Sequence, residues 1–102
     1  MTPKEKRAAV VAKLRTVYDP ELPVNIFDLK LIYGIVIRGS SVALTMTLTT
    51  PNCPVAETLP AAAADAVRQL DWAKKVSLDL TFEPPWTPNL LDDDVRLAIG
   101  FL

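Results

Sequence analysis

The sequence predicts an α+β fold: a two-layer αββαβ domain in which helices cover one face of a three-stranded mixed sheet, followed by a short C-terminal helix. Apolar residues recur at helical spacing in some segments and alternate with polar residues in others. The alternating segments are apolar on one face only, so they need a helical layer on one side. We therefore expect one domain over residues 1–102.

The first helix has clear start and stop signals. Thr2-Pro3-Lys4-Glu5 has the form of a capping box with proline at the first helical position. Apolar residues follow at helical spacing, so the helix is expected from about Pro3 to about Val17. Asp19-Pro20 should end it, because proline disfavours the helical conformation in the residue before it.

The loop from Asp19 to Asp28 mixes carboxylates, prolines and large apolar residues. Loops that only connect two elements rarely have so many apolar anchors. We expect this loop to pack on the body of the protein and to hold the carboxylates of Asp19 and Glu21 in fixed positions. Asp28 is interpreted as a cap of the turn into the first strand.

Three strands are expected. The first, Leu31 to Arg38, is rich in Ile, Val and Tyr, and Gly39-Ser40-Ser41 is a turn signal. Residues 42–49 alternate apolar residues with threonine and alanine, which predicts the second strand of a hairpin. The third strand, Val76 to Glu83, alternates in the same way.

Two further helices are expected. After a short turn near residues 54–58, the second helix should run from about Pro60 to Leu70, because proline is tolerated at the start of a helix and not inside it. Asp92 is expected to cap the C-terminal helix, which Gly100 ends.

Composition limits the possible partners and compartments. The 102 residues include 11 basic and 12 acidic side chains, and the basic residues form no cluster, which disfavours nucleic acid and anionic lipid as partners. No apolar stretch approaches the roughly 20 residues of a membrane span, and the first residues do not resemble a signal peptide. The lone cysteine cannot form an internal disulfide. We therefore expect a cytoplasmic protein.

That lone cysteine, Cys53, lies where strand alternation gives way to the start of a helix. A thiol at a helix N-terminus faces unpaired N–H groups, which favour the thiolate that binds metal or attacks an electrophile. The alternative is a small buried hydrophobic residue.

Topology predicts what surrounds Cys53. If the second and third strands are parallel neighbours, Cys53 and Glu83 lie at the same end of the sheet, and the loop with Asp19 and Glu21 enters the first strand from that end. Ligands tend to bind at such strand ends. We therefore expect the segments with Asp19 and Glu21, with Cys53, and with Glu83 to converge on one site.

Five further residues are expected near this site, either as support for it or as contacts for a partner. Thr50 either hydrogen-bonds the Cys53 sulfur or finishes the strand, and Asn52 and Glu83 are expected to support the site. Trp86 is either a lid on the core or an anchor for a partner, with Thr87 beside it.

Four stretches also resemble a known family. The chain is similar to the SufT branch of the iron-sulfur maturation family that includes PaaD and a eukaryotic cytosolic targeting subunit. The resemblance covers nearly the whole chain and rests on residues 19–29, 31–33, 46–54 and 82–88. One departure is Lys30, where such sequences usually have a small residue, often glycine. The chain also stops without the cysteine-rich tail of PaaD-type members.

The resemblance implies an αββαβ fold, a functional cysteine at Cys53 and a non-enzymatic role in assembling iron-sulfur clusters or delivering them to client proteins. The implied partners are a Suf-type assembly scaffold and the clients.

The chemistry of Cys53 is restricted by what the sequence lacks. Without histidine there is no Cys-His catalytic pair, and without a second cysteine one chain cannot build a site of four thiolate or imidazole ligands. An iron-sulfur cluster or iron ion would be held transiently, with help from Asp19, Glu21 or Glu83, from a second Cys53 in a homodimer, or from a partner. The alternative is an enzyme that uses Cys53 as nucleophile and Asp19 or Glu21 as acid or base.

Overall fold

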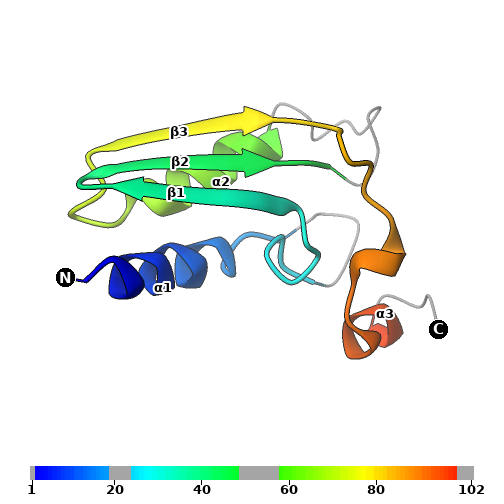
Figure 1. Ribbon diagram of the computed structural model, residues 1–102. Helices are drawn as coiled ribbons and strands as arrows, with labels where there is room; N and C mark the ends of the chain where they lie inside the picture. Colours follow the sequence, from blue (N-terminus) through cyan, green and yellow to red (C-terminus); the bar gives the residue numbers. More distant parts are fainter. Residues whose placement is uncertain (1, 19–23, 49–57, 99–102) are drawn as a thin grey trace.

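The computed structural model describes residues 2–18, 24–48 and 58–98, which form a three-stranded sheet with helices on one face (Figure 1). The strand order is β1-β2-β3, with β1 and β2 antiparallel and β2 and β3 parallel. This confirms the predicted mixed sheet. The elements are α1 (Pro3–Leu14), β1 (Ile32–Arg38), β2 (Ser41–Met46), α2 (Thr58–Arg68), β3 (Lys75–Leu80), the 3-10 helix η1 (Pro88–Leu90) and α3 (Asp93–Ala98).

The capping box at the start of α1 is confirmed. The Thr2 hydroxyl accepts the N–H of Glu5 at 3.1 Å, and the Glu5 carboxylate accepts the N–H of Thr2 at 3.1 Å. These bonds lower the pKa of Glu5, since they favour its charged form. The helix ends at Leu14, about one turn before the predicted Val17, because the N–H groups of Thr16 and Val17 bond to carbonyls three residues back and tighten the chain.

The hairpin turn contains two residues, Gly39 and Ser40. Gly39 has a φ of 62°, as expected for the first position of a type II′ turn. Ser41 was predicted to belong to the turn, but it pairs with Arg38 and begins β2. Because β-carbons disfavour positive φ, glycine at this position sets the hairpin register.

The second helix begins two residues earlier than predicted, at Thr58. Pro60 therefore lies inside its first turn. Proline is tolerated there because the first N–H groups of a helix have no acceptor within the helix. The third strand ends at Leu80, before the predicted Glu83, although the N–H of Thr81 still bonds to the Met46 carbonyl at 2.8 Å.

Both long helices pack on the same face of the sheet. The core contains Val10 and Leu14 of α1, Ala63 and Val67 of α2, and inward-facing strand residues. The alternation predicted for β2 is confirmed, since these residues are buried: Val42, Leu44 and Met46. On the other face, Val36 of β1 stays 51% exposed.

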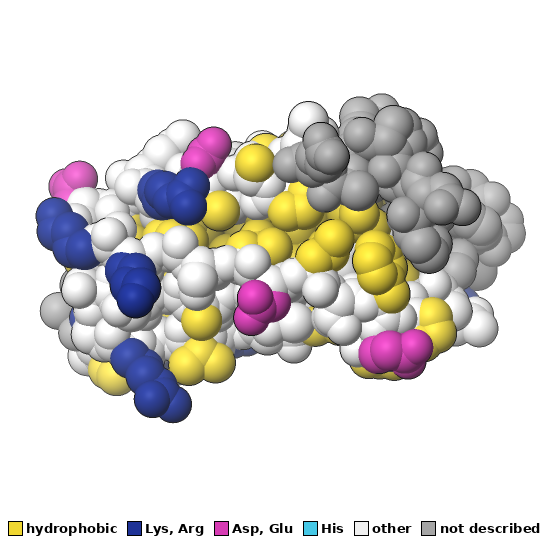
Figure 2. Space-filling model, turned by 90° about the horizontal axis from the view of Figure 1, so that it is seen from above, with side chains coloured by type: hydrophobic (Ala, Val, Ile, Leu, Met, Phe, Trp, Pro, Cys, Tyr) yellow, Lys and Arg dark blue, Asp and Glu magenta, His cyan; other side chains and the backbone are white. Residues whose placement is uncertain are grey.

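The charges are unevenly placed on the side that Figure 2 shows. Lysine and arginine side chains gather toward the left end, which is the end of the β1–β2 turn in Figure 1. Apolar side chains form a band over the middle and extend toward the opposite end. The described residues include no helix with the length and hydropathy to cross a bilayer.

Candidate functional site

Three segments that are distant in the sequence meet at one end of the sheet. Because β2 and β3 are parallel, they finish at the same end, where Met46 pairs with Leu80. The segment before β1 enters from that end, and its Leu31 carbonyl accepts the N–H of Thr47 at 2.8 Å. The predicted parallel pairing, on which the proposed site depends, is therefore confirmed (Figure 1).

The described part of the acidic loop is anchored as predicted. Ile26 and Leu29 are fully buried. The Asn25 side-chain oxygen accepts the N–H of Asp28 at 2.9 Å, and the Asn25 amide donates to the Asp28 carboxylate at 2.9 Å. Asp28 also lies 3.5 Å from Arg15. The Asn25 side chain therefore caps this turn, and Asp28, which was expected to be the cap, supports it by accepting the Asn25 amide.

Lys30, the position that departs from the family pattern, has a φ of 61°. This left-handed conformation disfavours any residue with a β-carbon, by roughly 1–2 kcal/mol. The turn needs it, because the Lys30 and Leu31 N–H groups bond to the carbonyls of Phe27 and Ile26 at 3.0 and 3.1 Å. A glycine at position 30 would adopt this conformation without strain.

Residues 81–87, which we call the strap, run from the end of β3 across to the start of β1. The Tyr33 hydroxyl donates to the Pro84 carbonyl at 2.8 Å, and the Trp86 indole N–H donates to the Leu29 carbonyl at 2.6 Å. Trp86 is partly buried and packs against the core. The strap is therefore tied to β1 through Tyr33 and to the segment before β1 through Leu29.

The structure places three of the predicted site residues on the strap. Glu83 and Thr87 are exposed, and the backbone of Glu83 exchanges hydrogen bonds with the Thr81 hydroxyl at 3.2 and 3.4 Å. Among the described residues, nothing hydrogen-bonds or pairs with the Glu83 carboxylate, which lies at the end of the sheet where β2 and β3 finish. Trp86 packs against the core, which is compatible with the lid role, and its contact with a partner stays a prediction.

Two polar residues near the strap were missed by the sequence interpretation. Tyr33 lies at a bulge between Ile32 and Gly34, and burial raises the pKa of its phenol, while the nearby Thr47 hydroxyl opposes this rise. Thr47 is fully buried, and its hydroxyl makes no hydrogen bond of normal geometry within the described ranges. The alternation placed Thr47 on the polar face of the predicted second strand, so no local pattern signalled its burial or its approach to Tyr33.

The remaining predicted site residues lie outside the described residues: Cys53, Asp19, Glu21, Thr50 and Asn52. Their convergence stays a prediction. Tyr18 and Asn25, which flank one of these segments, pair in a β-bridge. Within residues 2–18, 24–48 and 58–98, no three Cys, Asp or Glu side chains gather in a group that could hold a metal ion.

The fold and the arrangement of these segments define a small α+β domain with its candidate site at the end of parallel strands. A family model described as iron-sulfur cluster assembly protein matches residues 7–79. The chain belongs to this family, which confirms the resemblance found in the sequence motifs.

Three similar proteins illustrate the relationship. A Porphyromonas gingivalis protein named Fe-S protein maturation auxiliary factor is 45% identical, over 91% of this chain and 90% of its own length. A Synechocystis iron-sulfur cluster carrier protein is 38% identical over 90% of this chain but only 25% of its own length. The solved structure of a conserved hypothetical protein from Thermotoga maritima has a TM-score of 0.80 and 34% identity, covering 98% of this chain and 95% of that one.

Proposed function

We propose that this protein is an accessory factor that helps to assemble iron-sulfur clusters or to deliver them to client proteins. The main support is the 45% identity to a maturation auxiliary factor over 91% of the chain. The carrier relative adds a second argument, because this domain makes up about a quarter of it. A domain joined to a cluster carrier in one protein is suited to act beside such a carrier when it is a separate chain.

Cys53 is the proposed ligand of the iron or the cluster. It is the only thiol in the sequence, and iron-sulfur clusters are held mainly by cysteine thiolates. Asp19 and Glu21 would supply oxygen ligands, while Thr50, Asn52 and Glu83 would support the site. This assignment is favoured by the parallel β2–β3 pair, which brings the chain beyond β2 and the strap to one end of the sheet.

One thiolate per chain implies that the cluster is shared. The missing ligands would come from a partner or from the Cys53 of a second copy in a homodimer. Transient sharing suits a factor that passes a cluster from a Suf-type scaffold to clients, with Trp86 and Thr87 contacting the partner. A lone thiol also suits a reducing compartment, so we place the protein in the cytoplasm.

Anaerobic reconstitution with iron and sulfide tests this proposal, with Mössbauer spectroscopy and native mass spectrometry as the measurements. The wild type should take up iron, and Cys53→Ser should lose this uptake while keeping its circular dichroism spectrum. Asp65→Asn is a matched control, because Asp65 pairs with Arg68 on the exposed side of α2, and it should bind iron normally. Equal iron uptake by Cys53→Ser would refute the ligand assignment.

The same samples separate the accessory role from the nucleophilic enzyme. A nucleophile would be labelled rapidly and stoichiometrically at Cys53 by an electrophile near neutral pH. We expect slow labelling in the iron-free protein, and client enzymes in cells that produce only Cys53→Ser should lack their clusters. Normal client maturation in those cells would contradict the proposed role.

A further inference from the structure

The outer edge of β1 is a free sheet edge next to a pocket. Within the described ranges, β1 pairs only with β2. Arg38 and Ser41 form the last pair of the hairpin, and hydrogen-bonded pairs alternate with non-hydrogen-bonded pairs along an antiparallel ladder. The N–H and C=O groups of Ile35 and Ile37 therefore point away from β2. Unpaired edges of this kind are templates for another strand.

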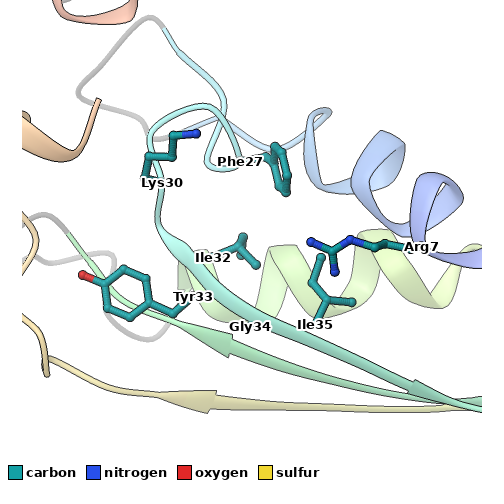
Figure 3. Close-up of a pocket in the computed structure, with 7 residues that line it drawn as sticks. All are labelled: Arg7, Phe27, Lys30, Ile32, Tyr33, Gly34 and Ile35. Carbon is teal, nitrogen blue, oxygen red and sulfur yellow. The ribbon is translucent and has the colours of Figure 1, made fainter. Parts of the chain in front are cut away.

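The pocket lies between this edge and α1 and has a volume of about 170 Å³. We call it the edge groove. Phe27, Ile32 and Ile35 supply its apolar side chains, and Arg7 and Lys30 supply positive charge (Figure 3). The Arg15 guanidinium lies 5.1 Å from the centre of the Phe27 ring and helps to hold this wall in place.

The two cations of the edge groove are available to a ligand. Figure 3 shows the Arg7 guanidinium and the Lys30 ammonium on different sides of the groove, both extending toward it. Neither forms an ion pair with another residue in the described part of the chain, whereas Arg15, Arg68 and Arg96 all do. Two unpaired cations beside apolar walls favour an acidic ligand that also has apolar groups.

The backbone at Lys30 adds a separate argument. A lysine at a φ of 61° destabilises the fold relative to glycine at the same position. Strain at a residue with a functional group suggests that the group has a use. Here the strained position places an ammonium group in the edge groove.

We propose that the edge groove binds an extended, acidic segment of a partner protein. The segment would add to the free edge of β1 through the backbone of Ile35 and Ile37, as in other cases of β-strand addition. Its alternate side chains would place a carboxylate between Arg7 and Lys30 and apolar groups against Phe27. The inference goes beyond the proposed function, because it requires no metal at Cys53.

The test uses the full chain labelled with nitrogen-15 and an eight-residue, end-blocked peptide of alternating glutamate and valine. Binding should shift the amide resonances of Lys30, Ile35 and Ile37 and slow hydrogen exchange at Ile35 and Ile37. The double variant Arg7→Gln with Lys30→Gly should bind at least about tenfold more weakly, since two charge-assisted contacts are lost. The difference in affinity between the wild type and the double variant should become smaller at high salt.

Several controls make the result decisive. Lys4→Gln removes a charge from the same helix outside the groove and should leave the affinity unchanged. Lys30→Gly relieves strain, so weaker binding by this variant cannot come from unfolding. A peptide with glutamine in place of glutamate should bind at least about tenfold more weakly.

Three results would overturn the proposal. The first is equal binding of the glutamine peptide. The second is free glutamate producing the same shifts at the same concentration, which would indicate a site for small anions. The third is a dimer of the protein alone in sedimentation, with slow exchange at Ile35 and Ile37 before peptide is added, which would mean that a second copy occupies the edge.

Discussion

The indole N–H of Trp86 donates a hydrogen bond of 2.6 Å to the carbonyl of Leu29, joining residues 57 positions apart. Leu29 is fully buried at the end of the loop that leads into β1. Together with the Tyr33–Pro84 bond, this contact fastens the strap over the end of the sheet where β2 and β3 finish. The strap therefore positions Glu83 and Thr87 at the same end as the candidate site.

Trp86→Phe should destabilise the protein more than Trp72→Phe. The first change removes the hydrogen bond from the Trp86 indole N–H to the Leu29 carbonyl and leaves the acceptor of a buried residue without this donor. The Trp72 indole N–H is buried without a partner among the described residues, so its removal relieves a cost. The free energies of unfolding should differ by about 1–3 kcal/mol in urea titrations.

These two variants lose similar ring area, which makes them a matched pair. Trp72→Phe also weakens the contact with the Lys6 ammonium, 5.2 Å from the Trp72 ring centre. That contact is exposed at one end and contributes about 0.5–1 kcal/mol, less than the expected difference. Equal destabilisation by the two variants would show that the Trp86–Leu29 bond contributes nothing to stability.

Lys30→Gly should raise the free energy of unfolding relative to Lys30→Ala by about 1 kcal/mol. Both variants remove the ammonium group, and only glycine relieves the positive φ of 61°. Thermal unfolding should show the difference as a melting temperature higher by roughly 4–8 °C. A more stable alanine variant would mean that residue 30 does not adopt the left-handed conformation.

The free energy of unfolding should fall at alkaline pH because of Tyr33. The fall begins near the usual tyrosine pKa of 10.0 and continues until the pH passes the pKa of Tyr33 in the folded protein, which is higher. Burial raises that pKa, so the folded protein keeps the Tyr33 proton at a pH where the unfolded chain has lost it. A folded state that binds more protons becomes less stable with rising pH.

Chemical denaturation between pH 8 and pH 11 measures this effect. Tyr33→Phe should make the stability less dependent on pH in this range, although it lowers stability at pH 8 by removing the bond to Pro84. Tyr18→Phe, at a tyrosine that is 57% exposed, is the control and should keep the alkaline loss. An unchanged alkaline slope in Tyr33→Phe would contradict the prediction.

Thr47→Val should lower the free energy of unfolding by less than about 0.5 kcal/mol, because the hydroxyl makes only a weak contact with the Tyr33 phenol. The Thr47 side chain is fully buried, and its hydroxyl makes no hydrogen bond of normal geometry with the described residues. Valine has the same shape without the unsatisfied oxygen. A clear loss of stability in urea titrations would mean that this hydroxyl is bonded in solution.

Local patterns in the sequence were sufficient for the elements and their faces. The Thr2–Glu5 capping box, the glycine turn at Gly39 and the alternation in β2 each depend on residues close in the chain. Parallel pairing of β2 with β3 was a condition suggested by the helix between them, and the structure met it. The motif resemblance was enough to identify the family.

The ends of the elements were less predictable. The first helix stops at Leu14 because the next N–H groups bond to carbonyls three residues back instead of four. The helix α2 begins before Pro60 because the first turn of a helix tolerates proline. Such choices differ by small energies, so periodicity alone does not decide them. The placement of Cys53, Asp19 and Glu21 remains a prediction for experiment.

By itself, the sequence determined which faces of the elements are apolar, and therefore the layers, because side-chain periodicity is a local property of the backbone. Only the tertiary structure decided that Trp86 reaches Leu29, that Tyr33 reaches Pro84 and that Arg7 and Lys30 share a groove. These relationships join residues that are far apart in the chain. They depend on how packed layers bring loops and edges together in space, which no local pattern records.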